Sequence, residues 1–416
     1  MILAIDYGST SFKAAVFTSS VRAAPLAAGA GKLAYRFAAG GRVELDVAEV
    51  HGALRRALAG VRKFTPGVQA IALTSQAQTF TVADARGRAQ RPFISWQDGR
   101  AAAACGRLRG KLRDFTDHCS FGDLAPALQV CQLFSEPPRR GDFVLPLPSY
   151  FVRLWTGESV IDNNLAAMSG LYSLRDGCWW PEALKLCRLR TSQLPRVVSI
   201  GAVAAQTTHA ARAFGLPVGI PIVLAGNDQT AGAYAARLEE NRGLLLTLGT
   251  AQVAYICTTR PPRPASSLAR GPYPGGRYYR MAADACGGNI INWAQSVLAG
   301  CGTDRQFFAQ AAQGRLGVTF AADLDVGRGS WRQIDLSHTP ADLARAILES
   351  LSQRMAVLVQ RLRLPSIAGP ILVAGGGSAQ PLWCDLVSAA LGAKLIPTEA
   401  SPLLGAARMA VARECV

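Results

Sequence analysis

The sequence contains no uninterrupted apolar run of about 18 residues, the length that a membrane-spanning helix needs. It also lacks the basic start of a signal peptide, because its first apolar run is short and ends at Asp6. The ten cysteines include no Cys-x-x-Cys pair and the four histidines lie far apart, so the spacing of a zinc site is absent. We therefore expect a cytoplasmic protein with reduced thiols and no membrane partner.

Acidic residues are scarce, since 28 Asp and Glu face 44 Lys and Arg and leave a formal net charge of +16. A nucleic-acid-binding surface requires a concentrated basic stripe, usually with interleaved aromatic residues. Here the arginines are dispersed, and the tightest basic cluster lies within residues 107–113. We therefore expect a positive surface field that attracts small polyanions, and no nucleic-acid partner. Nucleic-acid binding stays open as an alternative that a salt-dependent gel shift would test.

The first seventeen residues, MILAIDYGSTSFKAAVF, predict a buried strand, a tight polar turn and a second strand. These three parts cover residues 2–5, 7–11 and 12–17. Gly8 lets the backbone approach a ligand closely, and Ser9 and Thr10 add hydroxyls beside exposed N–H groups. Such a turn suits an anion, and Asp6 at its base can hold an accompanying Mg²⁺ through water. A plain hairpin with a polar tip is the alternative.

A second turn of the same kind occurs at residues 244–256, LLLTLGTAQVAYI. Two strand–turn–strand phosphate loops, one in each half, resemble the ATPase core shared by sugar kinases, actin and the heat-shock chaperones. The strand over residues 220–225 begins the second half. We therefore predict two domains of ordinary size, covering residues 1–224 and 225–416.

Polar residues follow three predicted core strands, where α/β proteins place their ligands. Residues 75–78 and 95–98 are interpreted as two walls of one substrate pocket, with solvated strand ends as the alternative. The third strand leads into Gly226-Asn227-Asp228-Gln229 and then a helix rich in small residues. An Asp at such a junction often only caps the helix, so Asp228 has a structural as well as a functional interpretation.

A buried strand, three glycines and a helix are predicted over residues 371–392. Three glycines let a flat ring or a phosphate lie against bare backbone, and the helix start favours an anion, although a plain turn is the alternative. Residues 124–134 and 340–363 predict helices, the second with a capping Thr and an early Pro. Residues 259–277 are rich in Pro and Gly and predict an irregular surface loop or lid.

Together these segments resemble the FGGY carbohydrate kinases, the family of xylulokinase, ribulokinase, glycerol kinase and sedoheptulokinase. Seven motifs occur in the family's order between residue 1 and about residue 410. They are AIDYGSTSFKAAVF, SQAQTF with ISWQDGRA, YFVRLWTGESVIDNNLAAMSGLYSL, GIPIVLAGNDQTAGAYAA, LTLGTAQ, RGSWRQIDLSHTPADLARAILES and AGGGSAQPLWCDLVSAALGAKLIPTEASPLLGAA. Each motif alone is short, and their order carries the resemblance, although the chain is shorter than most members.

The resemblance implies an α/β fold of two actin-like, ribonuclease H-like ATPase domains with a catalytic cleft between them. It implies a carbohydrate kinase that uses ATP and Mg²⁺ to phosphorylate an alcohol group, with Asp228 as the catalytic base. Asp6 would hold Mg²⁺ through its waters. The residues implied to bind ATP are Asp6, Gly8, Ser9, Thr10, Lys13, Gly249, Thr250, Gly375, Gly376, Gly377 and Ser378. Those implied to bind the sugar are Gln76, Gln78, Trp96, Asp98, Asn227 and Asp228.

The predicted sugar pocket offers amides, an indole and carboxylates but no basic group for a phosphate, so the expected acceptor is a neutral sugar or polyol. A ketopentose or heptulose is favoured. The turn has Ala77-Gln78 where xylulokinases carry Met-His, so the resemblance does not single out xylulose. Two alternatives remain: a catalytically weak sugar sensor of the same fold, and another actin-like ATPase. The one protein partner that we name is a second copy of the same chain, in a homodimer.

Overall fold

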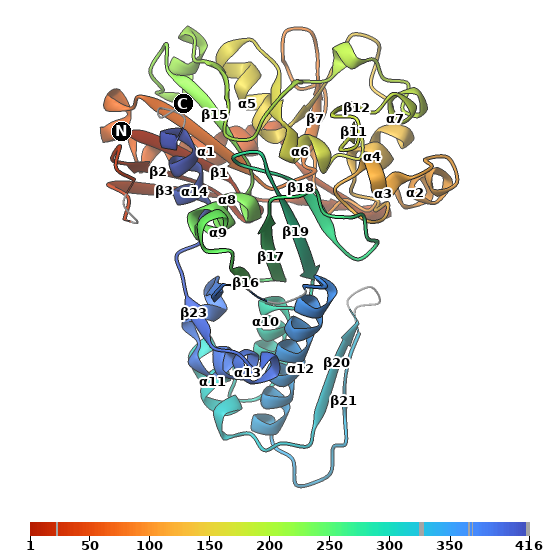
Figure 1. Cartoon of the computed structure of the whole chain (residues 1–416), viewed down its shortest axis with the longest axis vertical. Coiled ribbons are helices and arrows are strands. Elements are labelled where there is room, and N and C mark those ends of the chain that lie inside the picture. Colours follow the sequence, from red (N-terminus) through yellow and green to blue (C-terminus); the bar gives the residue numbers. More distant parts are fainter. Residues whose placement is uncertain (22–23, 324–327, 365–366, 368, 413–416) are drawn as a thin grey trace. The chain divides into compact units, whose positions relative to one another are not determined.

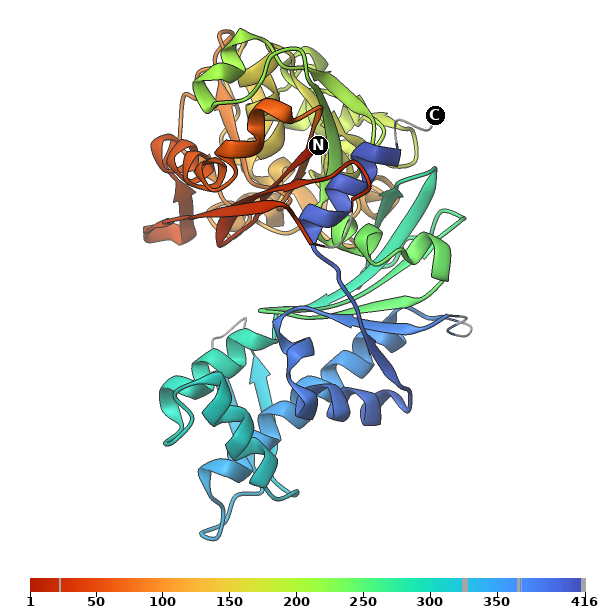
Figure 2. The same cartoon turned by 90° about the vertical axis from the view of Figure 1, so that its left-hand side faces the viewer.

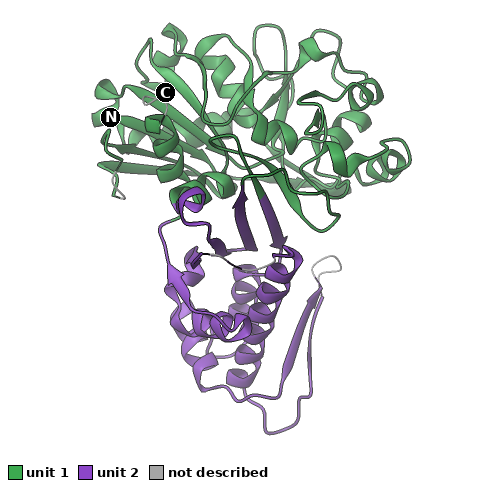
Figure 3. Cartoon of the chain, in the orientation of Figure 1, with its two compact units in different colours: residues 1–235, 259–279, 400–416 green, residues 236–258, 280–399 purple. Residues whose placement is uncertain are grey.

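The computed structural model of the chain describes residues 1–21, 24–323, 328–364, 367 and 369–412. It divides into two compact units, coloured separately in Figure 3. Unit 1 comprises Met1–Ala235, Thr259–Tyr279 and Ala400–Val416, and unit 2 comprises Ala236–Thr258 and Arg280–Glu399. The units are assembled from discontinuous segments, whereas the predicted domains 1–224 and 225–416 are continuous. That division of the chain into domains remains a prediction.

Unit 1 is built around a six-stranded mixed sheet (Figures 1 and 2). Its strands, in spatial order, are β14 (Val203–Gln206), β15 (Pro221–Asn227), β6 (Ala70–Ser75), β1 (Ile2–Tyr7), β2 (Ser11–Phe17) and β3 (Ala27–Lys32). The three central strands β15, β6 and β1 run parallel. Their carboxyl ends therefore meet at one edge of the sheet, and each is followed by one of the polar turns that the sequence singled out.

Helices cover both faces of this sheet. They are α1 (Val47–Ala59) and α5 (Leu147–Thr156) on one face, and α8 (Asp228–Ala235) and α14 (Pro402–Ala412) on the other. Side chains of β1 alternate between the two cores: Leu3 and Ile5 pack in the first, and Ile2 and Ala4 in the second. This alternation explains why the opening run is apolar throughout, since a strand covered on both faces has no solvated side.

The rest of unit 1 forms a smaller sheet with short helices and strands around it. The smaller sheet has the order β4 (Arg36–Ala38), β5 (Arg42–Leu45), β8 (Phe93–Ile94), β7 (Phe80–Ala83) and β9 (Phe143–Pro146). The short helices are η1 (Ala39–Gly41), η2 (Arg62–Gly67), α2 (Ala102–Arg109), α3 (Phe115–His118), α4 (Gln129–Ser135), α6 (Asn163–Ala167), α7 (Pro181–Leu186), η3 (Thr191–Gln193) and η4 (His209–Phe214). The remaining strands are β10 (Val160–Asp162), β11 (Tyr172–Ser173), β12 (Cys178–Trp179) and β13 (Arg196–Val198).

Unit 2 contains a mixed sheet and the helices that pack on it. The strands, in spatial order, are β19 (Arg277–Asp284, of which residues 280–284 belong to unit 2), β17 (Gln252–Thr258), β16 (Leu244–Leu248), β22 (Ile371–Ala374) and β23 (Leu395–Pro397). The helices are α9 (Leu238–Asn241), α10 (Gly288–Val297), α11 (Asp304–Gln313), α12 (Pro340–Arg361), η5 (Gly376–Ala379) and α13 (Pro381–Leu391). In a separate two-stranded sheet, β20 (Thr319–Asp323) pairs antiparallel with β21 (Arg328–Arg332). A capping box at Thr339 and Asp342 starts α12, as the sequence predicted.

Two predictions of local structure were wrong. The helix predicted from residue 124 begins only at Gln129, because Pro126 lies in a turn in which the Leu128 N–H bonds to the Ala125 carbonyl. Residues 259–277, predicted to be irregular, contain the strand β18 (Ala269–Tyr273). In that strand Gly271 lies against the ring of Tyr279, where a Cβ would come within 2.8 Å of the ring, so the glycine serves close packing there.

Among the described residues, no helix has both the length and the apolar character needed to cross a membrane. Each of the nine cysteines within that part of the chain is a free thiol.

Candidate active site

The first polar turn joins β1 to β2 and closes over the carboxylate of Asp6. Asp6 is buried, lies opposite Lys13 in the strand register, and its Oδ1 has no hydrogen-bond partner among the described residues. A Cβ on Gly8 would lie 2.9 Å from the Ser11 carbonyl oxygen and 3.5 Å from Asp6 Oδ2, so the turn needs glycine here. The turn therefore presents backbone and hydroxyls directly above a buried acid.

The electrostatics of Asp6 connect it to the second candidate acid. Burial first, and then the negative charge of Asp228, raise the pKa of Asp6 to about 7, while the charge of Lys13 acts in the opposite direction. The structure thus brings Asp6, Lys13 and Asp228 close enough to interact, although more than 200 residues separate the first from the last. Two carboxylates beside one another favour a bound cation or a shared proton.

Asp228 begins α8, but it does not cap that helix. The cap is Asn227, whose Oδ1 accepts a hydrogen bond from the Thr230 N–H at 3.0 Å. Asp228 accepts a hydrogen bond from the adjacent Gln229 N–H, at 2.8 Å, and remains partly exposed. Burial raises its pKa to about 6, against that backbone hydrogen bond and the charge of Lys13. The residue that caps the helix is therefore Asn227, and the capping role considered for Asp228 does not apply.

The turn that carries Asp228 is fixed from below by Asn164, a residue that the sequence analysis did not select. Its fully buried amide accepts a hydrogen bond from the Asn227 N–H at 3.0 Å. It donates to Thr230 Oγ1 at 3.1 Å and to the Pro272 carbonyl at 2.8 Å. One side chain thereby provides hydrogen bonds to polar groups of β15, α8 and β18. No sequence pattern indicated these contacts, because Asn164 lies in a different motif from Asn227 and Thr230.

The walls of the predicted sugar pocket carry unsatisfied polar groups. Gln76 is buried, and neither atom of its amide has a hydrogen-bond partner among the described residues. Gln78 has a left-handed backbone, with φ of 63°, a conformation that costs energy in a residue other than glycine. The Trp96 backbone N–H donates to Thr79 Oγ1 at 3.1 Å, while the residue as a whole is 41% exposed. An indole on a fixed backbone and a buried amide without partners suit a polyhydroxy ligand.

Tyr35 connects this pocket to the first polar turn. Its hydroxyl donates to the Ser9 carbonyl at 2.6 Å. Burial raises the pKa of Tyr35, while its proximity to the side chains of Gln76 and Ser95 lowers it. No sequence signal pointed to Tyr35, because it lies in a three-residue connection between two short strands.

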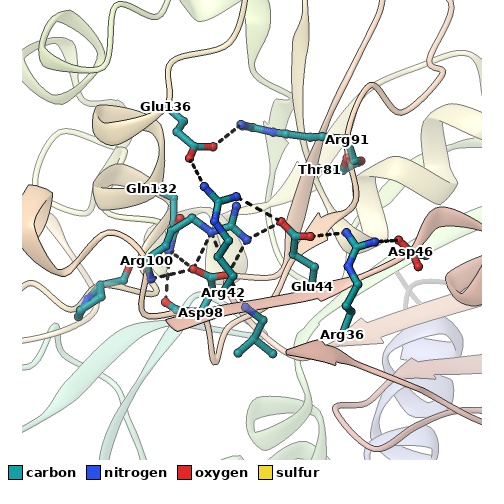
Figure 4. A network of polar contacts seen from close by, with 12 residues as sticks. Arg36, Arg42, Glu44, Asp46, Thr81, Arg91, Asp98, Arg100, Gln132 and Glu136 are labelled. Atoms are coloured by element: carbon teal, nitrogen blue, oxygen red, sulfur yellow. Dashed lines mark hydrogen bonds and ion pairs between the residues drawn. The ribbon is translucent and has the colours of Figure 1, made fainter. Parts of the chain in front are cut away.

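Asp98, by contrast, is fully engaged within the protein (Figure 4). Its Oδ2 accepts from the Val43 N–H at 2.7 Å, and Arg100 donates to both carboxylate oxygens at 2.7–3.0 Å. Arg100 also pairs with Glu44 at 2.6 Å. Burial acts to raise the pKa of Asp98, but these hydrogen bonds outweigh it and lower that pKa. A sugar contact by Asp98 stays a prediction, and its occupied oxygens favour a role in positioning the Trp96 loop.

In unit 2 the second polar turn connects β16 to β17 and is held by the start of α10. The Gly249 carbonyl accepts from the Gly288 N–H at 2.8 Å, and the Thr250 carbonyl accepts from the Asn289 N–H at 3.2 Å. The three glycines follow the neighbouring strand β22. A Cβ on Gly375 would lie 2.6 Å from the Leu248 carbonyl oxygen, and one on Gly377 would lie 2.4 Å from the Trp383 ring. The two glycine turns are therefore packed against one another.

A pocket of about 310 Å³ opens between these turns, within unit 2. Its lining combines the predicted Gly249, Thr250, Gly376 and Gly377 with residues that the sequence analysis did not select. Those are Leu248, Gly288, Ile291, Asn292, Asp304, Phe308, Gln380 and Trp383. Ser378 does not line it, and its hydroxyl donates to the Gly375 carbonyl at 2.7 Å. An apolar wall beside bare backbone suits a nucleotide base and ribose.

Comparison with known proteins relates both parts of the chain to one family. Residues 1–117 and 139–235 match the N-terminal domain of the FGGY family of carbohydrate kinases, and residues 244–413 match its C-terminal domain. Xylulose kinase of Escherichia coli K12 is 28% identical, covering 82% of this chain and 75% of that protein. L-fuculokinase of the same strain is 24% identical, covering 76% and 71%. The solved structure of Plasmodium falciparum glycerol kinase with ADP superposes with a TM-score of 0.86 at 15% identity, over 98% of this chain and 88% of that one, which confirms the predicted α/β fold.

Proposed function

Because this chain belongs to the FGGY family of carbohydrate kinases, we propose that it transfers the γ-phosphate of MgATP to a hydroxyl of a neutral sugar or polyol. ATP-dependent phosphorylation of a sugar or polyol is the activity of the family. The Mg²⁺ ion, the class of acceptor and the roles of individual residues are the proposal. The observation that carries it is the pair Asp6 and Asp228 at the sheet edge where the carboxyl ends of β1 and β15 meet.

Asp228 acts as the base for the attacking hydroxyl. Its carboxylate has one local hydrogen bond and is accessible, so a lone pair remains for the proton of the acceptor. A pKa of about 6 leaves it mostly ionised at pH 7 while making it a better proton acceptor than an ordinary aspartate. Its proton uptake accompanies the attack of the sugar oxygen on phosphorus.

Asp6 suits a Mg²⁺ ion held through water. Its unpartnered Oδ1 offers an acceptor, and burial and the charge of Asp228, which raise its pKa, disfavour an ionised carboxylate that a bound cation would stabilise. No cluster of three or more His, Cys, Asp or Glu capable of holding a metal occurs among the described residues, and Mg²⁺ usually keeps most of its water shell beside one or two carboxylates. When bound, the ion neutralises charge on the phosphates.

Each unit, taken by itself, carries groups that suit ATP. In unit 1, the backbone of Gly8, the hydroxyls of Ser9 and Thr10 and the exposed Lys13 would contact or support the phosphates. In unit 2, Gly249 and Thr250 offer a second phosphate-binding turn. Gly375, Gly376, Gly377 and Ser378 form the adenosine shelf, and Trp383 beneath Gly377 keeps it rigid. Backbone N–H groups in such turns bind phosphate without a dedicated side chain.

The acceptor is an uncharged polyhydroxy compound, with a ketopentose or heptulose favoured. Gln76, Gln78, Trp96 and Asn227 would read its hydroxyls, with Asp98 holding the Trp96 loop. Arg100 is the basic residue next to this wall, and its guanidinium is already paired with Asp98 and Glu44. The named relatives differ in their sugars, and identities near 25% do not choose among them.

The direct test is a coupled ADP-release assay with MgATP and a panel of neutral ketoses, aldoses and polyols. One strong responder would support the proposal and identify the substrate. Sugar binding in a calorimeter without ADP release would favour the sensor, and ADP release that no sugar stimulates would favour another actin-like ATPase. A cytoplasmic location and a homodimer remain part of the proposal, the second checked by light scattering.

A further inference from the structure

Another pocket occurs in unit 1, and it shares no lining residue with the sites described so far. It has a volume of about 310 Å³ and lies where α1, η2 and η4 meet. We call it the arginine groove, because three of its lining residues are Arg55, Arg62 and Arg212; the others are Leu58, Ala59, Thr65, Ala213, Phe214 and Gly215. None of its lining residues in the described part of the chain is acidic.

The two chain segments that form the arginine groove are unusual in charge. The sequence has no Asp or Glu between Glu49 and Asp84, and none between Glu182 and Asp228. Both segments that line the groove fall inside these acid-free stretches, so no carboxylate of these segments neutralises the three guanidinium groups. In a chain whose basic residues are otherwise dispersed, this arrangement concentrates positive potential in a concave surface.

The three arginines also have no ion-pair partner among the described residues. Arg55 lies over the ring of Phe214, with its Cζ 5.1 Å from the ring centroid, so a cation–π contact orients its guanidinium. The adjacent Arg56 provides the contrast, because it points elsewhere on α1 and pairs with Glu49 at 2.9 Å. Of these two neighbouring arginines on α1, Arg56 is therefore already paired with a carboxylate of the protein, whereas Arg55 is not, among the described residues.

We propose that the arginine groove binds a small phosphate-bearing anion. Guanidinium groups match the oxygens of a phosphate in pairs, and three of them around one hollow suit a multiply charged anion better than a neutral sugar. The volume is at the lower end of that of small-molecule sites, which suits a phosphate or pyrophosphate ester. The groove shares no residue with the nucleotide pocket of unit 2 or with the turn at Asp6, so it is a site additional to the proposed kinase site.

The test is calorimetric titration of the full chain with inorganic pyrophosphate at about physiological ionic strength, where weak surface attraction is screened. Wild type is compared with Arg212→Gln and with Arg56→Gln, which removes the same charge from the same unit but outside the groove. Binding at the phosphate turns is common to all three proteins, so only differences between them count. All the exchanged side chains are exposed, so equal thermal midpoints should confirm that the variants fold.

We expect Arg212→Gln to weaken one pyrophosphate site by about tenfold or more, the effect of losing one charged hydrogen bond. Arg56→Gln should leave that site unchanged, and Arg62→Gln should reproduce the loss. Equal isotherms for all proteins would overturn the proposal. An equal loss of pyrophosphate affinity in Arg56→Gln and Arg212→Gln would also overturn it, because the anion would then be attracted by the net charge of the protein and not by the groove. The arginine variants should keep wild-type kinase activity, because none of the exchanged residues belongs to the proposed kinase site.

Discussion

At the scale of single residues, the proposed mechanism depends on how firmly the turn before Asp228 is held. The Asn164 side chain hydrogen-bonds to both Asn227 and Thr230 and also to Pro272 of β18. It touches no reacting group in this account, so its role is to position the turn that carries the base. Misplacing a base by even about 1 Å costs a large factor in rate.

We therefore predict that Asn164→Ala lowers kcat by about ten- to a hundredfold while changing the KM for ATP little. It should also lower the free energy of unfolding by about 1–3 kcal/mol, because buried partners lose their hydrogen bonds. Steady-state kinetics and urea unfolding measure the two effects. Asn163→Ala is the matched control, since Asn163 lies in the same helix but its side chain accepts from the Ile200 N–H and, within the described residues, contacts neither Asn227 nor Thr230 through a hydrogen bond. Equal kcat for both variants would refute the positioning role.

At the scale of elements, the three glycines after β22 have different tasks although they are consecutive. Gly377 packs against the Trp383 ring and Gly375 has φ of 91°, whereas a Cβ on Gly376 would meet no atom within 4 Å. Gly376 nevertheless lines the nucleotide pocket. The protein itself does not require a glycine at that position, but a ligand lying against the backbone would.

Two alanine variants separate packing from ligand approach. Gly377→Ala should destabilise the protein by about 1–3 kcal/mol through overpacking against Trp383. Gly376→Ala should leave the thermal midpoint unchanged and weaken ATP binding, measured by calorimetry. Unchanged ATP affinity in Gly376→Ala would show that the adenosine does not lie on this shelf.

The same elements show what the sequence could and could not predict. Continuous apolar runs predicted β1, β6 and β22, and the glycine and capping signals predicted the turns that follow them and the start of α12. The strand β18 was missed because Pro272 and Gly271 are turn formers by composition, yet they fit an edge strand and a close ring contact. Asn164 and Tyr35 could not be selected, because their importance arises from contacts with distant segments.

At the scale of the whole molecule, charge shapes both stability and function. Asp6 has a pKa of about 7, far above the ordinary value near 4. The folded state therefore retains a proton on Asp6 at pH values where the unfolded chain has lost it, and ionising the folded carboxylate costs stability as pH rises from about 4 to about 7. The histidines His51 and His118, whose pKa values burial lowers, act in the opposite direction, so total stability mixes both effects.

The difference between wild type and Asp6→Asn isolates the contribution of Asp6. We compare the free energy of unfolding of the variant with that of wild type at each pH. We predict that this difference, variant minus wild type, is larger at pH 8 than at pH 5 by about 1 kcal/mol or more. Urea unfolding at the two pH values measures it. The same variant should lose activity, because it lacks the proposed Mg²⁺-binding carboxylate. A difference in the free energy of unfolding that does not change with pH would mean that the pKa of Asp6 is not raised in the folded state.

The central claim is that Asp228 removes the proton from the attacking sugar hydroxyl. The most direct measurement is the rate of ADP release by wild type and Asp228→Asn with the responding sugar, across pH 5 to 8, with ATP binding measured in parallel. We predict that wild-type turnover falls as pH drops through about 6, where Asp228 becomes protonated. The variant should lose about 10²–10⁴-fold in kcat at every pH while still binding ATP. Wild-type turnover in Asp228→Asn would contradict the account.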